Sequence, residues 1–75
     1  MKKIINFKIY QGEKYYVAEC IDLPIVTQGL SLDETMANIK EALSLHLEDE
    51  DLNTLHIMNN PAVSVNFDLG ELVYA

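Results

Sequence analysis

The side chains best suited to nucleophilic chemistry in this 75-residue chain are its single cysteine, Cys20, and its two histidines, His46 and His56. A thiol becomes a strong nucleophile when a neighbouring base holds it as a thiolate. Cys20 lies on an apolar face of a predicted strand, where a free cysteine usually packs as a small hydrophobic residue. His46 lies beside the apolar face of a predicted helix, where packing explains it more simply than catalysis. We therefore expect no catalytic residue and no enzyme activity.

A run of four acids, Glu48, Asp49, Glu50 and Asp51, is the second group that could do chemistry. A calcium loop of the EF-hand type needs alternating Asp or Asn ligands and a central glycine, and the run has neither. Such charge runs usually mark a solvated segment, here at the end of a helix, and they can also contact a partner. We take these four residues as the candidate partner-binding site, and we expect no metal and no cofactor.

The net charge of −7 is unevenly distributed along the chain. Residues 1–18 contain four lysines and one glutamate, whereas residues 19–75 contain one lysine and eleven acids. A surface this acidic is repelled by phosphate backbones, which argues against direct binding of nucleic acid. It is compatible with a basic protein partner, and equally with a role in solubility alone.

Length and composition indicate one domain over residues 1–75. A core of this size is marginal by itself, and a single cysteine supplies neither an intrachain disulfide nor a zinc site. No apolar run approaches the ~18 residues of a membrane helix, and the start of the chain is not typical of a signal peptide. We expect a cytoplasmic protein that does not bind membranes.

One amphipathic helix is predicted after Ser31. Apolar residues recur at spacings of three and four, which defines one apolar face of the helix. The residues of this face are Leu32, Met36, Ile39, Leu43 and Leu47, and Ala42 and His46 lie beside it. Ser31 and Glu34 match the capping box at a helix start. Leu45 falls on the polar side, either as a single exposed leucine or as part of an oligomer contact.

Strands are predicted on both sides of this helix. Ile5, Phe7 and Ile9 alternate with polar residues and predict a first strand, and residues 15–20 form the return strand of a hairpin. Residues 25–28 add a third strand. It ends at Gly29, which is free to take a positive φ. After the helix, residues 59–61 read as a turn and residues 63–69 as a strand, while residues 53–58 stay undecided. The expected fold is α+β, with a small antiparallel sheet, one helix packed on it and the order β-β-β-α-β.

Five short sequence pieces follow one another along the chain. They are an extended Tyr-Val-Ala run at Tyr16, Leu-Pro at Leu23, Gln-Gly at Gln28, the Ser-x-x-Glu helix start at Ser31 and the run Asn-Ile-Lys-Glu-Ala at Asn38. In this order the pieces resemble the N-terminal domain of the HicB-like antitoxins. The resemblance covers roughly residues 4–48. Three departures stand out: Ile25 and Val26 replace Gly-Cys after Leu-Pro, Ser31 replaces a threonine, and Thr35 replaces an alanine.

The resemblance implies a partial RNase H-like fold and a binding role, in which the domain neutralises a small basic HicA-like toxin ribonuclease by occlusion. RNase H chemistry itself needs clustered carboxylates that hold two metal ions. The outward positions of the first strand are Asn6 and Lys8 instead, so nuclease activity is not expected. We expect no C-terminal DNA-binding domain after the HicB-like domain, so operator binding is not carried over.

The alternative is a stand-alone homo-oligomeric sensor or scaffold domain without a toxin partner. Apolar residues are left over beyond the expected core, namely Leu45 on the helix and Leu72, Val73 and Tyr74 in the tail. The expected sheet also has at least one free edge. We therefore predict a homodimer or larger, with these four residues as the candidate oligomer contact.

Overall fold

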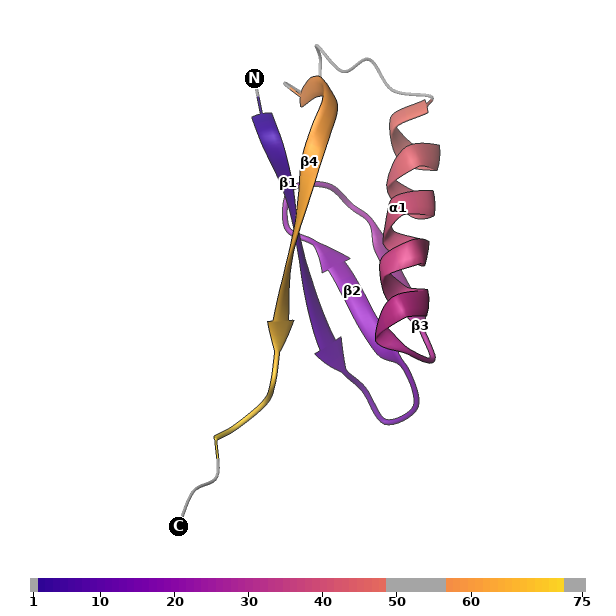
Figure 1. Ribbon diagram of the computed structural model, residues 1–75, viewed down its shortest axis with the longest axis vertical. Coiled ribbons are helices and arrows are strands. Elements are labelled where there is room, and N and C mark those ends of the chain that lie inside the picture. The colour runs from indigo at the N-terminus through magenta and orange to yellow at the C-terminus, as the bar shows by residue number, and fades with distance from the viewer. Residues whose placement is uncertain (1, 49–56, 73–75) are drawn as a thin grey trace.

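The computed structural model describes residues 2–48 and 57–72 and contains one helix beside one four-stranded sheet (Figure 1). The expected α+β fold and the order β-β-β-α-β are confirmed. In chain order the elements are β1 (Lys2–Gln11), β2 (Tyr16–Cys20), β3 (Val26–Gly29), α1 (Leu32–Glu48) and β4 (Ile57–Asp68).

The sheet has the strand order β3-β2-β1-β4 and is mixed. The first three strands pair antiparallel as expected, whereas β4 runs parallel to β1. The helix explains the difference, because a connection that carries the chain back over the sheet starts the next strand in the same direction as the previous one. Since β3 and β1 point the same way, β4 adds to β1 as a parallel strand at the far edge.

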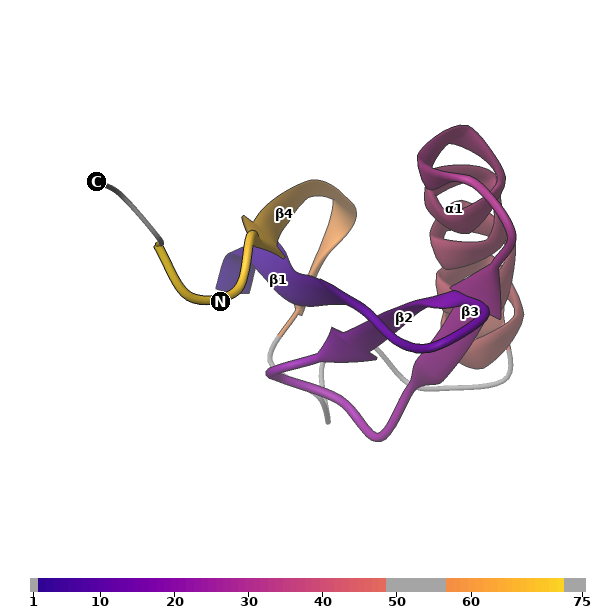
Figure 2. The same cartoon turned by 90° about the horizontal axis from the view of Figure 1, so that it is seen from below.

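The helix covers only part of the sheet. It packs against β3 and β2, and Figure 2 shows it above these strands while β1 and β4 extend to the other side. Among the described residues, seven buried apolar residues form the core; six come from the facing sides of the helix and the sheet, and Ile25 comes from the segment just before β3. They are Ile5, Phe7, Ile9, Ala18, Ile25, Ile39 and Leu43.

The apolar face of α1 is turned slightly from the predicted one. Ile39 and Leu43 are buried as expected, but Met36 is 39% exposed, so its predicted place in the core is wrong. Thr35 takes the buried position instead, with no exposed surface. Its hydroxyl donates to the Ser31 carbonyl at 2.7 Å, which satisfies the polar atom inside the core.

The start of α1 lies very close to the end of β3. A Cβ at Gly29 would lie 2.5 Å from Thr35 Oγ1 and 2.7 Å from Thr35 N, so no larger residue fits here. The expected positive φ at Gly29 is wrong: among the described residues, positive φ belongs to Gly70, at 80°. The missing side chain at Gly29 therefore serves close approach between backbones.

One of the two hydrogen bonds of the predicted capping box is present; among the described residues, the return bond from the Ser31 N–H to the Glu34 carboxylate is not formed. The hydroxyl of Ser31 accepts a hydrogen bond from the Glu34 N–H at 3.1 Å, and the Ser31 carbonyl accepts one from the Thr35 N–H at 2.9 Å. Asp33 and Glu34 occupy the first turn, where the helix dipole favours negative charge. Together these groups determine where the helix begins.

The predicted turn at residues 59–61 is wrong, because these residues lie within β4. The pairing with β1 is irregular there: Lys2 faces Ile57 and Ile4 faces Ala62, so β4 has extra residues over this stretch. Pro61 lies in the irregular part, where a residue without an N–H interrupts no regular ladder. From Ala62 to Asp68 the register with β1 is regular.

Candidate protein-binding surfaces

Two of the three side chains best suited to nucleophilic chemistry, Cys20 and His46, are half-buried in the fold. Cys20 is half-buried at the end of β2, packs against the core, and its sulfur accepts a hydrogen bond from the Leu23 N–H at 3.3 Å. His46 is half-buried on α1, and His56 lies outside the described residues. Over residues 2–48 and 57–72, no group of three or more His, Cys, Asp or Glu side chains is arranged to hold a metal ion.

The face of the sheet opposite the helix carries exposed polar pairs. The Lys8 ammonium lies 3.8 Å from the Asp68 carboxylate, which links β1 to β4. The Tyr10 hydroxyl donates to Glu19 at 3.1 Å, which links β1 to β2. This hydrogen bond raises the pKa of Tyr10 above its ordinary value of 10.0, with desolvation and the charge of Glu19 as smaller causes. Tyr10 therefore stays protonated at neutral pH and acts here as a donor that ties two strands together.

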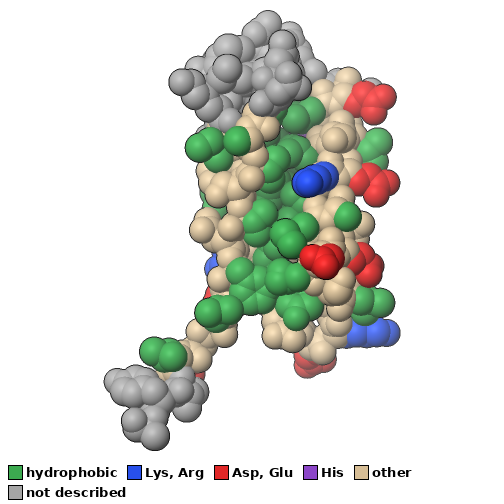
Figure 3. All heavy atoms as spheres, in the orientation of Figure 1, with side chains coloured by type: hydrophobic (Ala, Val, Ile, Leu, Met, Phe, Trp, Pro, Cys, Tyr) green, Lys and Arg blue, Asp and Glu red, His purple; other side chains and the backbone are tan. Residues whose placement is uncertain are grey.

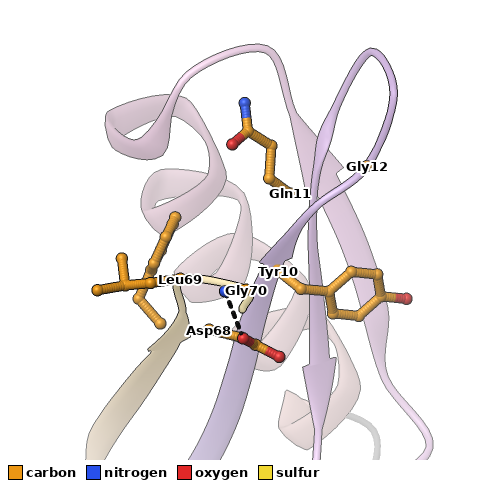
Figure 4. Close-up of a pocket in the computed structure, with 7 residues that line it drawn as sticks. Tyr10, Gln11, Gly12, Asp68, Leu69 and Gly70 are labelled. Atoms are coloured by element: carbon orange, nitrogen blue, oxygen red, sulfur yellow. Dashed lines mark hydrogen bonds between the residues drawn. The ribbon is translucent and has the colours of Figure 1, made fainter. Parts of the chain in front are cut away.

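A hollow of about 510 Å³ lies where β1 and β4 end, between residues 10–12 and residues 67–70. In Figure 4 the side chains of Tyr10 and Leu69 point to opposite sides and Gln11 points away from both. Gly70 donates its N–H to the Asp68 carboxylate at 2.8 Å and turns the chain out of the strand. Small-molecule sites are enclosed and have polar groups that converge on the ligand. The labelled side chains around this hollow point in different directions, so we assign it no ligand.

Exposed carboxylates follow the outer side of α1. Glu34, Glu41 and Glu48 are all exposed and recur every seven residues, close to two helical turns, so they lie in one row. Figure 3 shows acidic side chains gathered along the side of the helix that faces away from the sheet. We call Glu34, Glu41 and Glu48 the acidic row.

Leu45 lies within the acidic row and is 60% exposed. It follows Glu41 by four residues and precedes Glu48 by three, which are the spacings of neighbours on a helix surface. An apolar side chain surrounded by carboxylates gives the outer side of α1 both charge and a hydrophobic contact point.

Of the candidate partner-binding residues named from the sequence, Glu48 is exposed at the end of α1, and Asp49, Glu50 and Asp51 lie outside the described residues. Glu34 and Glu41 were not among the residues predicted to bind a partner. The seven-residue spacing to Glu48 was the signal that could have found them.

The two candidate oligomer contacts among the described residues, Leu45 and Leu72, lie on different sides of a single copy. Leu45 is on the outer side of α1, whereas the tail leaves the domain on the side of β4, as both ribbon views show (Figures 1 and 2). Leu72 in that tail is 83% exposed. Val73 and Tyr74 lie outside the described residues.

A band of apolar side chains lies between α1 and β4 (Figure 3). Because α1 covers β2 and β3, the half of the sheet nearer β4 is less covered. Val65 and Phe67 are half-buried and pack against the core, with the ring of Phe67 centred 5.9 Å from that of Tyr16. Val63, further along the same side of β4, is 39% exposed.

Comparison of the chain with protein families, with curated proteins and with solved structures finds no match in any of the three. Among the described residues, no helix has both the length and the apolar character needed to cross a membrane.

Proposed function

We propose that this chain is an antitoxin-type protein-binding domain, similar to the N-terminal domain of the HicB-like antitoxins. It neutralises a small basic HicA-like toxin ribonuclease in the cytoplasm by covering its RNA-binding surface. The observation that carries the proposal is the acidic row on α1, with the exposed Leu45 between its members. This surface has the two properties that a basic protein partner recognises, negative charge and an apolar anchor.

The order of elements supports the proposal, because β-β-β-α-β is the order that the resemblance implies. The departure from threonine at Ser31 is chemically neutral, since the Ser31 hydroxyl caps the helix through the same type of hydrogen bond. The departure from alanine at Thr35 is also accommodated, because its hydroxyl is paired with the Ser31 carbonyl.

Occlusion follows from the charge and length of the surface. A ribonuclease presents basic side chains to RNA phosphates. The carboxylates of the acidic row recur about every 10 Å along the helix axis, given a rise of about 1.5 Å per residue. They can therefore pair with several basic side chains at once and exclude RNA from the same surface.

The test begins with a tagged chain retained on a column and exposed to extract from its native cells at low and high salt. We expect a small basic protein that is held at low salt and released at high salt. The purified protein should degrade RNA, and adding the chain should inhibit that degradation. Recovery of the chain alone, or of a partner without ribonuclease activity, would overturn the proposal and favour the scaffold alternative.

Charge-matched variants localise the contact. Glu41→Gln with Glu48→Gln removes two charges from the acidic row, and Glu13→Gln with Glu71→Gln removes two exposed charges elsewhere. The first pair should weaken binding of the captured protein and flatten its salt dependence, while the second pair should leave the affinity near that of the parent. Equal affinities for the two variants would rule out α1 as the docking surface.

A further inference from the structure

The two edge strands of the sheet, β3 and β4, differ in how well they are protected against pairing with a further strand. The edge at β3 is only four residues long, and the Asn38 side chain donates to the Gln28 carbonyl at 2.7 Å. Short length and an occupied carbonyl are devices that protect a strand edge from pairing. The β3 edge is therefore partly blocked from within the same copy.

The edge at β4 lacks these protections over its regular part. Residues 62–68 keep an unbroken register with β1 on one side, and on the other side no strand of the described residues pairs with β4. Among the described residues, no side chain donates to or accepts from the backbone of residues 62–67. Pro61 and the irregular pairing lie before this segment, so its register is uninterrupted.

We propose that β4 pairs antiparallel with β4 of a second copy of this chain, which joins two sheets into one of eight strands. The two-fold axis is normal to the sheet and passes at Val65, the centre of the regular segment. This axis pairs all seven residues of 62–68 with their counterparts and keeps both helices on the same face. The inference is independent of the proposed toxin partner.

The sequence of β4 is self-complementary in this register. On the helix side, Val63 faces Phe67 of the second copy and Val65 faces its own counterpart, so β-branched and aromatic side chains meet. On the other side, Ser64 faces Asn66, a pair of uncharged polar groups. The half-exposed Val63 gains an apolar neighbour, which the single copy does not provide.

Charge also favours β4 over the other surfaces. Two copies carry −7 each, and their acidic rows repel one another. Residues 62–68 contain one charged residue, Asp68, which is already paired with Lys8. In the proposed register the two Asp68 residues are separated by about 20 Å along the strands, beyond the screening length of about 8 Å at physiological salt.

Sedimentation equilibrium across a dilution series tests the association, with expected masses moving from twice 8.5 kDa toward 8.5 kDa on dilution. Val63→Lys places a charge opposite Phe67 and should weaken the dimer about tenfold. Val26→Lys is the matched control, because Val26 is 68% exposed on the other edge strand. Loss of the dimer in Val26→Lys but not in Val63→Lys, or a mass of 8.5 kDa throughout, would overturn the proposal.

Amide hydrogen exchange of the parent protein tests the same pairing without any substitution. Pairing with β1 alone protects every second amide of residues 62–68, and pairing on both sides protects the intervening ones as well. We expect the intervening amides to be protected at high protein concentration and to exchange freely on dilution. A dimer in which they exchange freely would be held by another surface, and β4 would be excluded.

Discussion

Gly29→Ala tests the close approach of β3 and α1. The added methyl group would lie 2.5 Å from Thr35 Oγ1, 2.7 Å from Thr35 N and 3.0 Å from Thr35 Cα. Two of these three atoms belong to the backbone, so a change of rotamer cannot relieve the contact. Only two residues separate β3 from α1, so the helix cannot shift without disturbing the Ser31 cap.

The expected loss of stability can be estimated from two opposing terms. Forcing an extra carbon into a packed site costs about 1–3 kcal/mol, and contact with backbone favours the upper part of that range. Replacing glycine by alanine also stabilises the folded state by about 0.4–1 kcal/mol, because the unfolded chain loses freedom. The net loss is roughly 2 kcal/mol, which lowers the melting temperature of a domain this small by roughly 8–16 °C.

Urea unfolding followed by circular dichroism measures this loss, with Gly12→Ala as the control. The same methyl group at Gly12 would lie 3.1 Å from the Tyr15 carbonyl oxygen in an exposed turn that can adjust. It has the same effect on the unfolded chain, so we expect its free energy of unfolding to stay within about 1 kcal/mol of the parent. If Gly29→Ala unfolds at the same urea concentration as Gly12→Ala, the close approach of β3 and α1 is refuted.

Other substitutions test the helix and the strand pairing. Ser31→Ala removes the cap hydroxyl and should cost about 0.5–2 kcal/mol in urea unfolding; an unchanged midpoint would exclude the capping role. Ile39→Ala should cost about 2–5 kcal/mol because Ile39 is 1% exposed, whereas Leu45→Ala should stay within about 0.5 kcal/mol because Leu45 is 60% exposed. Equal losses would contradict the orientation of α1. The folded state favours protonated Tyr10, so this contribution is present below pH 10.0 and is lost as pH rises through the raised pKa. Absorbance titration should show one tyrosine ionising late in the parent and earlier in Glu19→Gln, and identical curves would argue against the hydrogen bond.

The local patterns of the sequence determined which face of the first strand is buried and where the helix begins. Ile5, Phe7 and Ile9 alternate with polar residues, and all three are fully buried. The Ser31 hydroxyl accepts the predicted hydrogen bond from the Glu34 N–H at the helix start. These features could be predicted because the period of a strand and the hydrogen bonds of a helix cap involve residues close together in the chain.

The rotation of α1 about its axis was decided by contact with β3. The spacing of apolar residues placed Met36 in the core. Thr35 and Met36 lie on opposite sides of Ile39 and Leu43 around the helix axis, so a modest rotation that keeps Ile39 and Leu43 buried brings Thr35 in and moves Met36 outward. The close approach at Gly29 places Thr35 inside and leaves Met36 at the border. Periodicity alone favours apolar residues over a threonine, so it could not anticipate this exchange.

The position of β4 depended on the tertiary structure most of all. The alternation of Val63, Val65 and Phe67 predicted a strand, but the turn signal at residues 59–61 concealed its first part. Pairing with β1 at Ile57 and again from Ala62 onward keeps these residues within the strand, although they have no regular partners of their own. The sequence by itself thus determined the chemistry of both candidate surfaces, the carboxylates of α1 and the self-complementary strand. Only the fold decided that β4 lies at the sheet edge, because strand order depends on contacts between residues far apart in the chain, which no local pattern encodes.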